Sequence, residues 1–229
     1  MRVSAGGPGG YDGRMSPSRQ TWFREALVVG SLLAPEGAAA YDTAMCWWGW
    51  PVAGGGTETI SAPSARLPVR FITPKRKQAM RPELLGVRFE LVFIKPERMF
   101  GVELLGEPGL RIRVTDRERT VIDMLDRSDL CGGVPTAAAA LFAAWASLDL
   151  ERLTEHLARF EGGTVPRRLG YLAERLGLLP PEDPVLLGWR GLIGAGYSLL
   201  ERGGPATGPF VRRWGLRDNV PALPAPFDP

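Results

Sequence analysis

RIRVTDRERTVIDML, residues 111–125, contains the change of period that decides the fold. Its first half alternates apolar and polar side chains, the pattern of a strand with one wet face, whereas Val121 and Leu125 follow a helical spacing. Thr115 and Glu118 stand three residues apart at the join. This spacing predicts a capping box, in which each side chain bonds an amide at the helix start. A strand is therefore expected to lead directly into a helix.

Two upstream segments, 69–73 and 87–94, show the same alternation and are predicted to be strands. Short connections that contain glycine and proline separate them from each other and from the strand at 110–114. Strands joined in this way commonly pair antiparallel. The middle of the chain therefore predicts a small antiparallel β-meander.

Helical patterns flank these strands on both sides. The expected helices cover 22–33, 38–50, 135–147, 149–160, 164–176 and one segment within 180–202. The alanine-rich part, 137–148, is a dozen residues long and thus too short to cross a bilayer. Trp47, Trp48 and Trp50 are expected in the core. The fold class is therefore predicted to be α+β, with the antiparallel meander packed against a C-terminal helical bundle.

The composition predicts one folded unit between two tails. Residues 1–20 are rich in glycine and proline and are predicted to be disordered, and the run of glycines at 54–56 is interpreted as a flexible connection rather than a phosphate-binding loop. Residues 21–203 form the expected domain, and the 45% hydrophobic content of the whole chain is sufficient for a core. The Pro/Gly-rich segment 204–229 is expected to be a tail that Trp214 partly anchors.

Cysteine and histidine usage limits the chemistry. Cys46 and Cys131 lie far apart, and the single histidine, His156, cannot complete a His/Cys metal cluster, so neither zinc nor another cofactor is expected. Two buried free thiols suit a reducing cytoplasm. His156 itself is expected to face solvent on its helix. The start of the chain lacks the apolar run of a signal peptide, which favours a cytoplasmic protein without a membrane partner.

Positive charge is concentrated in the middle of the chain. Residues 60–120 hold 13 Lys/Arg against 7 Asp/Glu, whereas the whole chain has a net charge of +3. Lys75, Arg76 and Lys77 directly follow a predicted strand, and Arg81 comes four residues later. Such a run either grips phosphates or an acidic protein surface, or it is a solvated hairpin tip that protects an edge strand. Residues 167–168 are expected to extend the basic surface from the exposed side of their helix.

Three stretches together resemble the C-terminal domain of AbiEi-type antitoxins. They are FITPKR at 71–76, the segment 111–125 and VPRRLGYLAERLG at 165–177, and the similarity extends over residues 24–220. The resemblance implies a cytoplasmic antitoxin of a type IV toxin–antitoxin system for abortive infection, a form of phage defence. Such a protein neutralises a nucleotidyltransferase-like toxin and represses its own operon by binding promoter DNA.

The chain departs from this family in one respect. A typical member carries a winged helix-turn-helix domain before the matched region, whereas about twenty residues precede Trp22 here. Autonomous reading of DNA sequence is therefore not expected. The expected function is binding without catalysis. The residues expected to contact toxin or DNA are Lys75, Arg76, Lys77, Arg81, Arg167 and Arg168.

Two alternatives remain at this stage. The first is a DNA-binding transcriptional regulator without a toxin partner, for which salt-sensitive promoter binding is expected. The second is a metal-dependent nuclease that uses Asp116, Glu118 or Asp123. A capping role for Glu118 competes with the second alternative.

Overall fold

The strand-to-helix junction is present in the computed structural model, which describes residues 17–52, 67–78, 80–106, 111–221 and 223. Strand β6 (Ile112–Thr115) leads into helix α3 (Arg117–Asp126). The predicted capping box is wrong, because Thr115 still pairs with Val102 in the sheet and the N-cap is Asp116. The Asp116 carboxylate accepts a hydrogen bond from the Arg119 amide at 2.7 Å. The junction therefore starts the helix one residue later than predicted.

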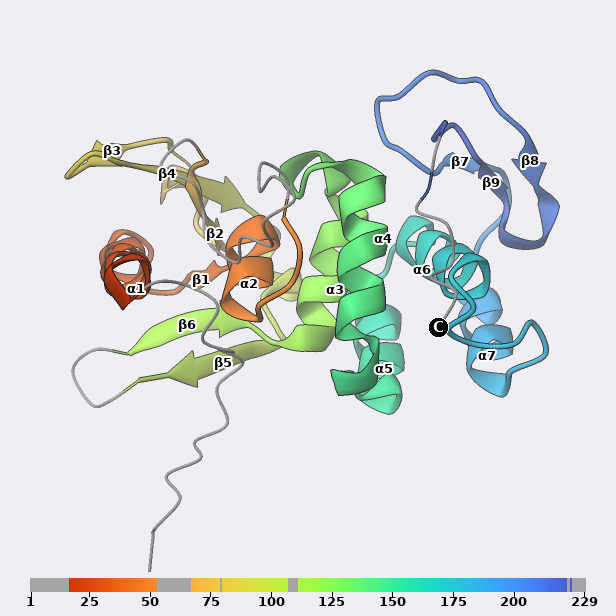
Figure 1. Cartoon of the computed structure of the whole chain (residues 1–229), viewed down its shortest axis with the longest axis horizontal. Helices are drawn as coiled ribbons and strands as arrows, with labels where there is room; N and C mark the ends of the chain where they lie inside the picture. The colour runs from red at the N-terminus through yellow and green to blue at the C-terminus, as the bar shows by residue number, and fades with distance from the viewer. Residues whose placement is uncertain (1–16, 53–66, 79, 107–110, 222, 224–229) are drawn as a thin grey trace, which may run out of the picture.

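A six-stranded mixed sheet forms one end of the molecule (Figure 1). Its order is β3 (Glu83–Leu84), β4 (Val87–Phe93), β2 (Val69–Thr73), β1 (Ala38–Ala39), β6 and β5 (Val102–Leu105). Three pairs are antiparallel, namely β3 with β4, β1 with β2, and β5 with β6. The predicted α+β class is thus confirmed.

The meander needs two corrections. Strand β6 lies between β1 and β5 rather than beside β4, and β2 and β4 pair in parallel, with Phe71 opposite Leu91. The cause of the parallel pairing is the connection between β2 and β4. After β2 and the 3₁₀ turn η1 (Arg76–Gln78), the chain runs back along the outer edge of β4 as β3 and turns again into β4. This extra reversal leaves β4 pointing in the same direction as β2. The two-residue strand β3 was not predicted.

The predicted helix at 38–50 is also partly wrong. Ala38 and Ala39 form β1, which lies between β2 and β6 and is fully buried. Helix α2 (Tyr41–Trp47) begins only after it. Alanine has a high intrinsic helix propensity, but the packing in the middle of the sheet overrides it here. The expected burial of Trp47, Trp48 and Trp50 is confirmed.

The helices cover the sheet and extend away from it (Figure 1). Helix α1 (Pro17–Leu33) contacts β1, β2 and β6, and it includes residues 17–20 of the predicted tail; the rest of that tail and the glycines at 54–56 lie outside the described residues. Helices α3 to α7 pack on one another as the C-terminal bundle. The bounds of the remaining helices are α4 (Gly133–Ala144), α5 (Leu150–Phe160), α6 (Thr164–Arg175) and α7 (Pro184–Gly191), with 3₁₀ turns η2 (Pro96–Arg98), η3 (Ser128–Leu130), η4 (Trp145–Ser147) and η5 (Arg212–Trp214).

A second, three-stranded sheet closes the far end of the molecule (Figure 1). It has the order β7 (Ser198–Leu199), β9 (Leu216–Arg217) and β8 (Phe210–Val211). Trp214 is fully buried, as its expected anchoring role requires, and its ring packs on Gly170 of α6. A Cβ at position 170 would lie 2.1 Å from that ring. This sheet was not predicted, because its strands have two residues each and carry no readable alternation.

None of the helices that the structure describes combines the length and apolar character needed to span a bilayer. Cys46 and Cys131 are buried free thiols, as expected from the sequence.

Candidate functional site

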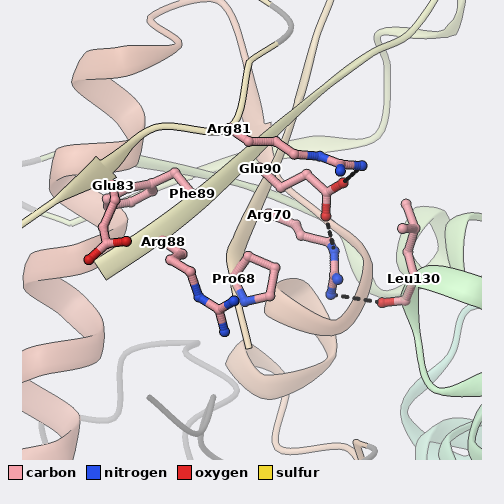
Figure 2. A pocket seen from close by; sticks show the side chains of 8 residues that line it. All are labelled: Pro68, Arg70, Arg81, Glu83, Arg88, Phe89, Glu90 and Leu130. Carbon is pink, nitrogen blue, oxygen red and sulfur yellow. Dashed lines mark hydrogen bonds and ion pairs between the residues drawn. The ribbon is translucent and has the colours of Figure 1, made fainter. Parts of the chain in front are cut away.

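The outer edge of the first sheet holds a chain of charged side chains (Figure 2). Arg81 on the connection to β3 pairs with Glu90 of β4 at 2.8 Å, and Arg70 of β2 donates to the other oxygen of Glu90, also at 2.8 Å. Arg70 then reaches Asp42 of α2 and donates to the carbonyl oxygen of Leu130 at 3.1 Å. The four charged groups connect the solvent-exposed edge to the interior.

Asp42, at the inner end of this network of charged side chains, has an unusual electrostatic environment. Burial raises the pKa of Asp42 to about 6, although the adjacent Arg70 guanidinium lowers it. Only Oδ2 of Asp42 meets Arg70. Oδ1 is buried without a hydrogen-bond partner among the residues that the structure describes. The ionised form of Asp42 is therefore incompletely solvated by the protein.

A hollow of about 400 Å³ opens beside these charged side chains. Arg70, Arg81 and Arg88 line it together with Glu90, and Phe89 adds an apolar wall (Figure 2). The lining mixes both signs of charge with apolar surface. Such a lining fits a polypeptide surface at least as well as a phosphate backbone, which would need an excess of cations.

Four of the six predicted contact residues gather along this edge; we call Lys75, Arg76, Lys77 and Arg81 the basic edge. Lys75 forms an ion pair with Glu36, and both side chains are more than half exposed. The Arg76 guanidinium lies over the Phe93 ring at 4.7 Å, and Lys77 is exposed. These exposed pairs contribute little to stability, so a partner can replace them at small cost.

An exposed apolar tip lies on the same edge. Leu84 pairs with Val87, and the two residues between them, Leu85 and Gly86, form a tight turn with φ values of 53° and 73°. Asn or Gly normally fills the first of these left-handed positions, because a Cβ is strained there. Leu85 nevertheless occupies it with 93% of its surface exposed, and Leu84 is 40% exposed.

The prediction that the other two contact residues lie on the exposed side of their helix is wrong. Arg167 and Arg168 are 4% and 3% exposed. Arg167 donates to the carbonyl oxygens of residues 194–196 and of Gly215, while Arg168 donates to Leu125 O and, at 3.1 Å, to Leu199 O. Both side chains link backbone segments in the interior, because neighbouring elements cover α6 on almost all sides. They cannot contact a partner in this fold.

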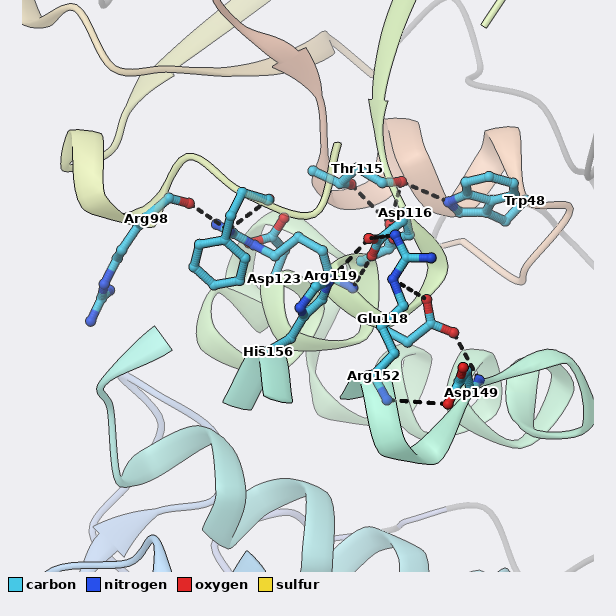
Figure 3. Close-up of polar contacts among 12 residues, drawn as sticks. Trp48, Arg98, Thr115, Asp116, Glu118, Arg119, Asp123, Asp149, Arg152 and His156 are labelled. Atoms are coloured by element: carbon cyan, nitrogen blue, oxygen red, sulfur yellow. Dashed lines mark hydrogen bonds and ion pairs between the residues drawn. The ribbon is translucent and has the colours of Figure 1, made fainter. Parts of the chain in front are cut away.

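His156 is also corrected, since it lies against the start of α3 rather than in solvent. Its side chain is 13% exposed, and Nε2 is 3.0 Å from Oδ2 of Asp116 (Figure 3). Arg152 donates to the same carboxylate oxygen at 2.8 Å. Burial raises the pKa of Asp116, but the hydrogen bonds from His156 and from the Arg119 amide lower it by more. The pKa of Asp116 is therefore below its ordinary value.

The carboxylates of the nuclease alternative all have partners within this network. Asp123 accepts from Arg119 at 2.8 Å, and Glu118 accepts from the Asp149 amide at 2.9 Å. Arg119 also donates to the Phe100 carbonyl at 3.2 Å, which fixes the loop before β5 to α3. These contacts give each of the three acidic side chains a structural role (Figure 3). Within the described ranges, no group of three or more His, Cys, Asp or Glu side chains is arranged so that it could hold a metal ion.

The sequence did not lead us to predict the pairing of Arg70 with Asp42 or the exposed turn at Leu85. Arg70 and Asp42 are 28 positions apart, so the printed sequence carries no signal of their pairing. The tip did carry a signal, because Leu85-Gly86 stands between segments that pair. A residue followed by glycine at this place indicates a two-residue turn.

Comparisons of this chain with models of known families, with curated proteins and with solved structures found no match.

Proposed function

We propose that this chain is the antitoxin of a type IV toxin–antitoxin pair and neutralises a nucleotidyltransferase-like toxin by binding it. The resemblance of three sequence stretches to AbiEi-type antitoxins supports the choice of partner. The second and third of these stretches meet in the fold, where Arg168 bonds the last turn of α3. Arg119, Arg167 and Arg168 and the carboxylates Asp116, Glu118 and Asp123 of these two stretches are buried and serve the interior. These buried groups leave recognition of the partner to surface residues.

The observation that carries the proposal is the strained, exposed Leu85 beside the basic edge. A left-handed backbone at a non-glycine residue is unfavourable by roughly 1–2 kcal/mol. An isolated protein gains nothing from placing a fully exposed leucine at such a position. Backbone strain combined with apolar exposure is typical of residues whose role is contact with a partner.

The chemistry of Leu85 and the basic edge indicates the kind of protein surface that they fit. Leu85 supplies an apolar anchor at one end of β4, and Arg76 and Lys77 supply cations at the other end, where Arg76 covers Phe93. A protein surface with a small apolar pocket beside acidic side chains complements both parts. A phosphate backbone complements only the cations.

The experiment measures toxin binding and growth rescue with three variants. Leu85→Asn removes the anchor and suits the turn, so we expect stability to rise by about 1 kcal/mol while toxin affinity falls. Reversing Lys75, Arg76 and Lys77 to glutamate should weaken binding and remove its salt dependence. Leu104→Ser is the matched control, because Leu104 is 51% exposed on β5 at the opposite edge of the sheet.

The proposal places the toxin gene next to the gene for this chain. Growth is measured with that toxin gene induced, and affinity by calorimetry with the purified toxin. Rescue by the wild type and by Leu104→Ser, together with failure of Leu85→Asn, supports the proposal. If the wild type does not rescue growth from a toxic neighbour, the antitoxin function is wrong. If the wild type rescues growth but Leu85→Asn and the charge reversal bind the toxin as tightly as the wild type, the docking surface is wrong.

Repression of the operon is a second role that the resemblance implies. A shift assay with promoter DNA tests it separately. Loss of DNA binding in the charge-reversed variant, with toxin binding unchanged, would assign the basic edge to DNA instead.

A further inference from the structure

The three-stranded sheet presents two aromatic rings to solvent. Tyr197, directly before β7, and Phe210 of β8 are 54% and 55% exposed. Their ring centroids are 4.9 Å apart at an interplanar angle of 72°. Arg217 of β9 lies with its guanidinium carbon 4.9 Å from the Phe210 centroid. Three neighbouring segments thus bring two aromatic rings and one guanidinium group together in a small cluster.

The backbone beneath this cluster is fixed from inside. The buried Arg167 gathers the carbonyl oxygens of residues 194–196, immediately before Tyr197, and that of Gly215 in the turn before β9. Gly208 has φ +97°, and a Cβ there would lie 1.9 Å from the Asp218 carbonyl oxygen. The rings are therefore held on a braced support and yet remain open to solvent. Ordinary core packing does not explain this arrangement.

The segment that carries the cluster has an excess of positive charge. Residues 190–217 contain five arginines and a single acidic residue, Glu201. The Glu201 carboxylate turns inward and accepts from Ser128 Oγ and from the Val134 amide. Of the arginines, 190, 202 and 212 are exposed, and Arg213 is ion-paired with Glu174. The segment that carries the cluster therefore has exposed cations, which attract polyanions.

We propose that Tyr197, Phe210 and Arg217 form a stacking site for the bases of single-stranded nucleic acid. Exposed rings receive unpaired bases, and cations nearby hold the phosphates, which is the general chemistry of single-strand binding. A duplex hides the faces of its bases and cannot use the rings. A proline-rich peptide also binds aromatic surfaces, but it gains nothing from the exposed arginines of this segment. This site is separate from the proposed toxin surface and does not depend on it.

The test is fluorescence anisotropy with labelled 12-nucleotide strands, oligo-U and oligo-dT, and with a 12-base-pair duplex. We expect the single strands to bind more tightly than the duplex and to lose affinity as salt rises. Tyr197→Leu and Phe210→Leu keep apolar bulk without an aromatic face, and each should weaken binding about tenfold. Phe142→Leu is the control, because Phe142 is 37% exposed on α4, outside the three-stranded sheet.

A second measurement needs no variant. Photo-crosslinking of a 5-bromouridine strand to the wild-type protein, followed by mass spectrometry, should place the label on Tyr197 or Phe210. Equal binding of duplex and single strand, or crosslinks confined to the basic edge, would overturn the proposal. So would binding of a labelled proline-rich peptide that Tyr197→Leu abolishes while oligonucleotide binding is absent.

Discussion

At the scale of single residues, arginine serves two opposite purposes in this chain. Arg119, Arg167 and Arg168 are almost fully buried and donate to backbone carbonyls or to a carboxylate, whereas Arg81 is 82% exposed. Sequence pattern does not separate the two kinds, because helical periodicity marks polar residues as exposed. The buried kind becomes recognisable only when several elements bring their free carbonyl groups to one place.

We expect Arg168→Lys to lower the free energy of unfolding by about 2–3 kcal/mol. Lysine keeps the charge but cannot reach both the end of α3 and β7, so buried carbonyl groups lose their donors. Urea unfolding followed by circular dichroism measures the change. Arg175→Lys on the exposed face of the same helix is the control and should change little. Equal stability of both variants would contradict the bracing role.

Asp42 should make stability depend on pH. Its pKa is raised to about 6 by burial, so the protonated form favours the folded state. The stability that this proton contributes is fully present below pH ~4 and is lost as the pH rises through about 6. The difference in unfolding free energy between wild type and Asp42→Asn should therefore fall by at most about 1.4 kcal/mol per pH unit in that window.

Urea unfolding at pH 4, 5, 6 and 7 measures this difference. Asp129→Asn is the control, because a hydrogen bond from Arg127 holds the pKa of Asp129 below its ordinary value. The difference in unfolding free energy between wild type and Asp129→Asn should therefore not fall between pH 4 and 6. A flat difference for Asp42→Asn would show that its carboxylate is ionised throughout this range.

At the scale of elements, the sequence predicted most helices and three of the strands but not their pairing. Alternation in 69–73 and 87–94 indicates a strand with one covered face, and it contains no information about the neighbour. The parallel pairing of β2 with β4 depends on β3, whose two residues follow Pro82 and are too few to show a period. Ala38 and Ala39 were assigned to a helix because only their place between β2 and β6 makes them a strand.

The candidate site was predictable to the same degree. The basic edge follows from a run of cations after a strand, and the structure places Arg76 over Phe93 and Arg81 against Glu90, both of β4. The inner pair, Arg70 and Asp42, depends on the packing of α2 against β2. Local pattern cannot show such a contact. Residues that meet through tertiary packing are therefore the part that sequence reasoning lost.

The start of α3 should be the most sensitive helix end. Asp116 caps the helix and also receives Arg152 and His156, so Asp116→Ala removes three interactions at once. We expect a loss of about 2–4 kcal/mol, more than an ordinary cap provides. Asp149→Ala, which removes the cap of α5 alone, should lose only about 1 kcal/mol. Thermal unfolding of both variants tests this order, and an equal loss would contradict it.

At the scale of the whole molecule, the two proposed surfaces lie at opposite ends, with the helices between them (Figure 1). Substitutions that share no contacts usually have additive effects. We therefore expect Leu85→Asn to leave oligonucleotide affinity unchanged and Tyr197→Leu to leave toxin affinity unchanged. Analytical ultracentrifugation should detect a ternary complex of toxin, protein and oligonucleotide. Competition between the two ligands would contradict this separation.

The contact between Gly170 and the Trp214 ring has a consequence for how this chain is able to evolve. The ring occupies the space that a side chain at position 170 would need, so neither residue can change size alone. In diverging descendants, glycine at 170 should accompany tryptophan at 214, and a bulkier residue at 170 should appear only with a smaller one at 214. The two positions, 44 residues apart, should be inherited as a unit.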